Sequence, residues 1–319
     1  MSAIPLSLRE AILEYCESVP GPEIARRAAH QSAQYRAGAA SQISASADMA
    51  AYLTVRLPAT FAAIRAALIH VHHRAPHFEP MSMLDFGAGP GTASWAAAEV
   101  WRNIQSFTMQ DQSESFRAAA KTLGGHSELP ALRQAKVQNS TSFRVDEQYD
   151  LIVAAYVISE LSEPAIPDVV ARLWRHCRGI LVIVEPGTPN GYQRIIRSRQ
   201  SLIEQHAIIG APCASDEPCP VESPDWCHFA VRLPRTRDRM RAKAARVPYE
   251  DEKFSFIAAA RESVSLTPPS PRIIAPVTST KAGLRFRLCT GHGISEADIP
   301  RRNRAVYHLQ MRKKWGDVI

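Results

Sequence analysis

The sequence has no apolar run near the roughly 20 residues that a membrane-spanning helix requires. It also lacks the unbroken apolar stretch of a secretory signal, because its first residues, MSAIPLSLREAILEYCES, include acids. No segment repeats along the chain. These absences argue against a membrane protein and against a secreted one, and they predict a cytoplasmic location.

Cysteine is scarce, with six residues in a chain of 319. In a reducing cytoplasm these cysteines are expected to remain thiols, so a group of them indicates a metal site or catalysis before disulfides. Four of the six follow residue 210. The chain is long enough to bury a full core without cross-links, as one large domain with additions or as two domains.

Acidic residues are fewer than basic ones, and the net charge of +7 with a pI near 9.2 favours an anionic partner. Two basic runs stand out, and each is equally well interpreted as a solvated helix face. Every second residue from Arg235 to Arg241 is arginine, a spacing that lines one edge of an extended chain but not one face of a helix. The runs are Arg232, Arg235, Arg237, Arg239, Arg241, Lys243 and Arg246, and Arg301, Arg302, Arg304, Arg312, Lys313 and Lys314.

Three sections follow one another along the chain. Residues 1–72 have the helical spacing of an N-terminal helical section. In residues 73–205 short apolar runs alternate with helical patterns, which predicts an α/β domain with a parallel, doubly wound sheet. Residues 206–319 are rich in cysteine and proline and are expected to form a metal-binding, RNA-contacting section. Strands are expected at 81–86, 104–109, 149–155, 179–184 and 284–288.

A glycine turn follows the first of these strands. The strand ends at Asp85 and leads through Gly87-Ala88-Gly89-Pro90-Gly91 into an alanine-rich helix, so the backbone can approach a ligand closely beside free N–H groups. About 20 residues later Asp111 ends the next apolar run, where an acid can bind ribose hydroxyls. Thr92 stands where a dinucleotide fingerprint needs Gly or Ala, which favours S-adenosylmethionine over NAD. A turn without a ligand, or a capping role for Asp85, is the structural alternative.

The pattern Asp-x-Gly-x-Gly-x-Gly resembles motif I of class I methyltransferases, which place substrate-facing residues after the fourth strand. Here that position reads Ala154-Ala155-Tyr156 and lacks the Asn/Asp-Pro-Pro-Tyr type of motif, which argues against methylation of a base amine. Tyr156 is expected either to stack on a substrate or to pack in the core. Glu185 either faces the pocket or only ends the fifth strand. No residue stands out as a general base.

Four cysteines share the last section. Cys213, Cys219 and Cys227 have the spacing C-x5-C-x7-C, and Cys289 follows after a long insert. Four thiolates complete either a tetrahedral zinc site or an iron–sulfur cluster, although the spacing matches neither a radical S-adenosylmethionine enzyme nor a C-x2-C zinc ribbon. Buried inert thiols are the alternative.

Other chemistry at these cysteines stays open. Pro218-Cys219-Pro220 resembles the Pro-Cys nucleophile of base C5-methyltransferases, but it follows the fifth strand, whereas that motif belongs after the fourth. His228 and His292 lie next to the cysteine segments and are either alternative ligands or ordinary polar residues.

With these motifs together, the chain resembles the methyltransferase-like assembly factors of the mitochondrial small ribosomal subunit and their bacterial relatives. The resemblance covers about residues 50–317. It is carried by AYLTVRLPATFAAI, LDFGAGPGTASWAA, DLIVAAYVISEL, VEPGTPNGYQRIIRSRQSLI, the APC…CP…DWCHF block, YEDEKFSF, and the closing LC and WGD.

The resemblance implies a class I methyltransferase fold, a [4Fe-4S] cluster held by Cys213, Cys219, Cys227 and Cys289, and association with small-subunit ribosomal RNA. The leading hypothesis is a protein that binds S-adenosylmethionine through the glycine turn and Asp111 and acts on, or helps assemble, the small ribosomal subunit. A non-catalytic RNA-binding assembly factor and a small-molecule methyltransferase are the other hypotheses.

Overall fold

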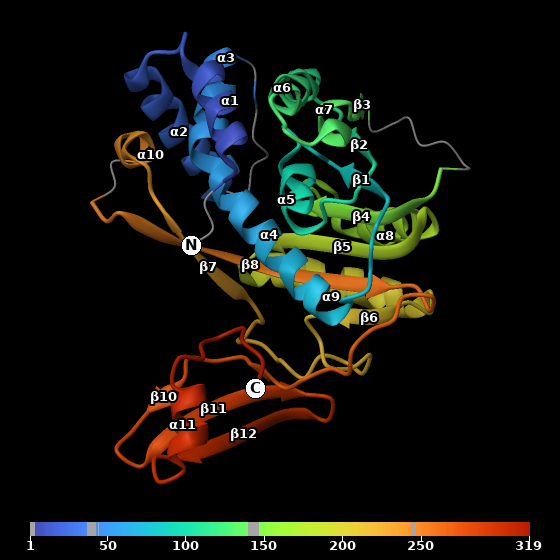
Figure 1. Ribbon diagram of the computed structural model, residues 1–319, viewed down its shortest axis with the longest axis vertical. Coiled ribbons are helices and arrows are strands. Elements are labelled where there is room, and N and C mark those ends of the chain that lie inside the picture. The colour runs from blue at the N-terminus through green and yellow to red at the C-terminus, as the bar shows by residue number, and fades with distance from the viewer. Residues whose placement is uncertain (1–3, 37–42, 44, 140–146, 244–245) are drawn as a thin grey trace.

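The computed structural model describes residues 4–36, 43, 45–139, 147–243 and 246–319. Within them lie a main sheet of eight strands and a smaller sheet of four (Figure 1). The main sheet has the order β3-β2-β1-β4-β5-β8-β6, and β7 also pairs with β8. Its strands are β1 (Ser82–Phe86), β2 (Ser106–Gln110), β3 (Lys136–Gln138), β4 (Tyr149–Ala155), β5 (Cys177–Pro186), β6 (Ile208–Ala211), β7 (Phe229–Pro234) and β8 (Tyr249–Ala260).

Strands β1 to β5 are parallel, and the predicted strands of this section coincide with β1, β2, β4 and β5. The prediction of a purely parallel sheet is wrong, because β8 runs antiparallel to β5, β6 and β7. A parallel neighbour needs a long crossover, whereas only the short helix α10 (Arg237–Ala242) lies between β7 and β8. The first half of β8, YEDEK, is charged, so only its second half reads as a buried strand.

Helices cover both faces of the main sheet. On one face Leu68 and Trp95 pack in the same core as Val153 of β4, and on the other Trp174 packs in the core of Ile152. Three layers around a sheet of order 3-2-1-4-5 with an added antiparallel strand make this a Rossmann-like class I methyltransferase fold. The helices are α4 (Leu57–Arg74), α5 (Thr92–Val100) and α6 (Glu114–Gly125) on the first face, and α8 (Ile166–Arg175) and α9 (Pro189–Glu204) on the second.

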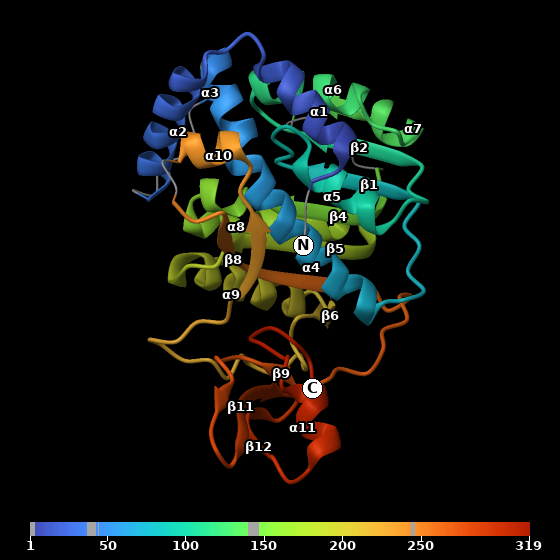
Figure 2. The same ribbon diagram turned by 60° about the vertical axis from the view of Figure 1, so that its left-hand side comes forward.

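The N-terminal section is helical, with α1 (Leu6–Cys16) and α2 (Gly21–Arg36) ahead of α3 (Ser46–Ala51), the π-helix η1 (Tyr52–Arg56) and α4. Although α10 comes much later in the chain, it packs against α2 and η1 (Figure 2). The short elements α7 (Pro130–Arg133), η2 (Ile158–Glu160) and η3 (Glu163–Ala165) connect the layers.

One helical stretch, Ser46–Arg74, is long and apolar enough by composition to cross a membrane, with a hydropathy of 1.3. In the structure this stretch packs within the protein. Leu57, Phe61 and Leu68 are fully buried, and α4 contacts α5 and β8. The core of the protein therefore accounts for its apolar composition.

The smaller sheet lies beyond β6 and α9, at the end of the molecule opposite the N-terminal helices (Figure 1). Its strand β11 contains the strand predicted at 284–288, and its core is formed by Ile273, Leu284, Phe286 and Leu288. Strands that follow residue 205 thus contribute to both sheets. The elements are β9 (Arg272–Ile273), β10 (Thr278–Ser279), β11 (Gly283–Thr290), β12 (Gly293–Pro300) and α11 (Arg304–Gln310).

Candidate functional site

The glycine turn between β1 and α5 has three left-handed residues, Gly87 (φ 68°), Gly89 (φ 53°) and Gly91 (φ 85°). At Gly87 a Cβ atom would lie 2.3 Å from Val157, so the turn after β4 presses against this glycine. At Gly89 the nearest atom to such a Cβ would be 3.9 Å away, which leaves room at the backbone. Only glycine combines these φ values with both the close contact and the open space.

Asp85 and Asp111 differ in what they do. The buried Asp85 carboxylate accepts hydrogen bonds from the Ser94 N–H and hydroxyl, both at 2.9 Å, and burial raises its pKa to about 7. It therefore stabilises the first turn of α5. The Asp111 carboxylate accepts from the N–H groups of Gly89 and Ser113, both at 2.8 Å. It thus joins the end of β2 to the glycine turn, and burial raises its pKa.

These residues fit S-adenosylmethionine. The structure brings Gly89 and Asp111 into direct contact, and the space at Gly89 is the kind of cradle that a side chain would fill and a ligand can use. The hydroxyl of Thr92, at the start of α5, is buried without a hydrogen-bond partner among the described residues. A donor and acceptor in that position is suited to a polar ligand.

The sequence did not point to two residues of η1 that lie beside the glycine turn. Tyr52 packs edge-on against Phe116, with ring centroids 5.1 Å apart, and its hydroxyl would be 4.0 Å from a Cβ at Gly89. The Arg56 guanidinium lies 5.0 Å from the ring centroid of Tyr156 and forms an ion pair with Glu252 at 3.4 Å. The available signal was their presence, four residues apart, in the first segment of the family resemblance.

The segment after β4 is held by an internal ion pair. Glu185 is fully buried and receives Arg194 Nε at 2.7 Å and the Ser159 N–H at 3.3 Å. Burial raises the pKa of Glu185 to about 7, against the lowering effect of Arg194. Glu185 thus fixes η2, which carries Glu160. Partial burial and the charge of Asp111 raise the pKa of Glu160, an acid of this site that the sequence did not single out.

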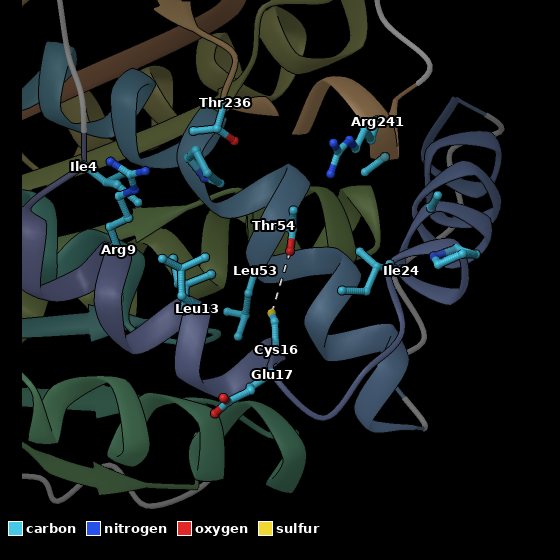
Figure 3. Close-up of a pocket in the computed structure, with 16 residues that line it drawn as sticks. Ile4, Arg9, Leu13, Cys16, Glu17, Ile24, Leu53, Thr54, Thr236 and Arg241 are labelled. Carbon is cyan, nitrogen blue, oxygen red and sulfur yellow. Dashed lines mark hydrogen bonds between the residues drawn. The ribbon is translucent and has the colours of Figure 1, made fainter. Parts of the chain in front are cut away.

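The opposite side of η1 lines a largely apolar cavity of about 520 Å³, which α1, α2 and α10 also enclose (Figure 3). Leu53 and Thr54 face it from η1. The Cys16 thiol contacts the Thr54 hydroxyl at 3.7 Å and the Ala50 carbonyl at 3.8 Å. Helix α1 therefore supports η1 from behind.

The four predicted metal ligands lie between the two sheets. Cys213 and Cys219 follow β6, Cys227 precedes β7, and Cys289 belongs to β11. A cavity of about 340 Å³ is lined by Cys213, Cys219 and Cys289 together with Arg199. As the side chains stand, however, no group of three or more His, Cys, Asp or Glu residues in the described part of the chain could hold a metal ion. The ligand geometry therefore does not support the predicted metal-binding domain.

The electrostatics of this neighbourhood favour a negative group. Burial and then the charges of the other three cysteines raise the pKa of Cys227, and burial raises that of Cys213 to about 11. Arg199 and Arg272 are buried here and donate to carbonyls of Ser215 and Pro212, among others, but neither has a carboxylate partner among the residues described. Buried cations without a counter-charge are costly, so thiolates or an anionic group are the expected compensation.

The alternative roles at the cysteines gain no partner in the described residues. The Cys219 thiol lies 3.2 Å from the Tyr192 hydroxyl, and both belong to the cysteine neighbourhood. His228 stacks on Trp226 and lies 4.2 Å from Trp315 between ring centroids, so it is a packed aromatic. His292 is exposed at the rim of the 340 Å³ cavity.

The expectation that Arg235, Arg237, Arg239 and Arg241 line one extended edge is wrong. The last three belong to the helix α10, where they face different directions. Arg239 is buried and, with Arg235 and Lys243, pairs with Glu250 of β8. This run therefore stabilises the fold. The second run surrounds α11 on the small sheet, and its exposed members are Arg301, Arg302, Arg304, Arg312 and Lys314.

Comparison with known proteins gives one family. The family model described as the mitochondrial small ribosomal subunit protein Rsm22 matches residues 46–319. The human mitochondrial ribosome assembly protein METTL17 is 27% identical over 285 residues, or 84% of this chain and 61% of that protein. The mitochondrial Rsm22-cox11 tandem protein 2 of Schizosaccharomyces pombe is 22% identical over 320 residues, or 84% and 42% of the two chains. The chain spans less than two thirds of either relative.

Likeness to solved structures is weaker. The magnesium protoporphyrin IX methyltransferase of Synechocystis, solved with bound S-adenosylmethionine, aligns with 82% of this chain and 100% of its own at 13% identity and a TM-score of 0.40. The precorrin-6y C5,15-methyltransferase of Geobacter metallireducens covers 62% and 86% at 12% identity and a TM-score of 0.41. The fold assignment rests on the strand order.

Proposed function

Because the chain belongs to the Rsm22 family, we propose that it is an S-adenosylmethionine-binding, methyltransferase-like factor that assembles or acts on the small ribosomal subunit. The observation that carries this proposal is the contact between the Asp111 carboxylate and the Gly89 N–H at 2.8 Å, which places a ribose acceptor beside an open glycine turn. When bound, the cofactor would supply an electrophilic methyl group. Asp111, Gly89 and the N-terminus of α5 would bind and orient it.

Asp111→Asn should weaken S-adenosylmethionine binding about 10- to 100-fold, because hydrogen bonds to a charged group contribute roughly 1.5–3 kcal/mol. Isothermal calorimetry on the folded variant measures this. Asp251→Asn is the control, since Asp251 pairs with Arg232 on the surface of β8 and should leave the affinity unchanged. Equal affinities for wild type and Asp111→Asn would contradict the assignment of this pocket.

We also propose an iron–sulfur cluster on Cys213, Cys219, Cys227 and Cys289, with structural zinc as the alternative. The family resemblance, the cavity lined by three of these cysteines, and the buried Arg199 and Arg272 support it. Binding would require the thiol side chains to turn toward one another, because they hold no ion as they stand. The cluster would then link β11 to the segments that flank β6 and β7.

The proposed partner is small-subunit ribosomal RNA, and the exposed basic residues near α11 are the proposed contact. Replacing Arg301, Arg302 and Arg304 by Ala should weaken RNA binding and reduce the slope of log affinity against log salt by up to about three. Filter binding across a salt series gives the slope. Replacing the exposed Arg102, Lys121 and Arg175 removes the same charge elsewhere and should leave the slope nearly unchanged. Equal slopes for the two triple variants would exclude the α11 surface.

Catalysis is the part of the proposal that separates it from its rivals. Transfer of labelled methyl from S-adenosylmethionine to small-subunit particles would distinguish an enzyme from a non-catalytic assembly factor. Failure to cosediment with those particles would favour a small-molecule methyltransferase. The cytoplasmic location stays a prediction from the reduced thiols.

A further inference from the structure

The π-helix η1 crosses the carboxyl edge of the main sheet between two fixed points. At its start Tyr52 lies against Phe116 of α6 and next to the backbone of Gly89. At its end Arg56 lies over the ring of Tyr156, at the end of β4, and pairs with Glu252 of β8. Single π-helical turns inside α-helices are rare and occur often at functional sites.

Tyr156 has an unusual backbone. Its φ of 61° is left-handed, a region that costs an aromatic residue free energy, and its N–H donates to the Val184 carbonyl at 2.7 Å. The surrounding structure maintains this conformation, since Val157 presses on Gly87 directly after it. The strain holds the Tyr156 ring under the guanidinium of Arg56, beside the glycine turn.

The charges around the turn indicate what Arg56 could bind. Asp111 and Glu160 make the ribose side of the site negative, and Arg194 is occupied by the buried Glu185. Arg56 brings a positive charge to the side next to β4. A guanidinium has five N–H donors, so it can keep Glu252 and still present two parallel donors to a second carboxylate.

We propose that Arg56, supported by Tyr156 and flanked by Tyr52, binds the α-carboxylate of the amino-acid part of S-adenosylmethionine. The proposal rests on the proposed function, because it takes the glycine turn and Asp111 as the site of the nucleoside part. Arg56 is then the residue that distinguishes the complete cofactor from an adenosyl compound without this carboxylate.

The test compares two ligands that differ only in that group, S-adenosylmethionine and decarboxylated S-adenosylmethionine, by calorimetry. Arg56→Gln should weaken binding of S-adenosylmethionine about 10- to 100-fold and leave binding of the decarboxylated compound within about twofold of wild type. Arg56→Lys, which keeps the charge but loses the fork, should fall between them. Arg232→Gln, an exposed arginine paired with Asp251, is the matched control and should change neither affinity.

Equal weakening of both ligands by Arg56→Gln would mean that Arg56 only maintains the local fold, and would overturn the proposal. So would wild-type protein that binds both ligands equally well. These results leave the proposed function intact. Wild-type protein that binds neither ligand would instead refute the proposed cofactor site, and the carboxylate subsite with it.

Discussion

Anaerobically purified protein should be brown and contain iron and sulfide, and Cys227→Ser should remove both. Loss of one ligand also removes metal-binding free energy, which at structural sites amounts to about 10 kcal/mol or more and is coupled to folding. The segments flanking β6 and β7 would lose their link to β11, so the melting temperature should fall sharply. Iron and sulfide assays with thermal unfolding measure both effects.

The chain offers matched controls for this result. Cys16 contacts Thr54 in the helical section, and Cys177 starts β5, so changing either to Ser should leave iron and sulfide unchanged. Cys213→Ser, Cys219→Ser and Cys289→Ser should behave like Cys227→Ser. Stoichiometric zinc without sulfide would replace the cluster by a structural zinc site. Colourless protein with neither metal would contradict both forms of the proposal.

The parallel half of the main sheet could be predicted because each of its longer strands is a short apolar run followed by a helical pattern. The prediction fails at β8, where the charged Glu250 and Glu252 lie in the same strand as a fully buried apolar run. The charged half pairs with β7 and meets the basic residues of α10, so partners distant in the sequence determine its place. Local periodicity contains no information about those partners.

The candidate site shows the same limit. The glycine turn and Asp111 were readable, since strand, turn and helix are contiguous in the sequence. Tyr52 and Arg56 reach the same turn through the packing of α4, and nothing local marks them. The arginines of the first basic run were assigned to RNA on charge alone. The buried carboxylate of Glu250 that neutralises them comes from another strand.

Glu250 concentrates three positive charges around one partly buried carboxylate, since Arg235, Arg239 and Lys243 all pair with it. Burial raises its pKa, but the charges of Arg239, Lys243 and Arg235 outweigh burial and hold the pKa below the ordinary value of 4.5. The carboxylate therefore contributes stability at pH values above about 4.5. That contribution is lost as the pH falls through the lower pKa of the folded state.

Glu250→Gln should lower the free energy of unfolding at pH 7 by about 3–5 kcal/mol, because it leaves the Arg239 guanidinium buried without its counter-charge. Urea unfolding measures the loss. The variant should also lose less stability than wild type between pH 5 and 3, in steps of about one unit, since it lacks the group that titrates there. Asp251→Asn breaks an exposed pair on the same strand and should change stability little. Adding Arg239→Met to Glu250→Gln should restore part of the stability, because the uncompensated cation is gone. A double variant no more stable than Glu250→Gln would show that the loss does not come from the buried charge.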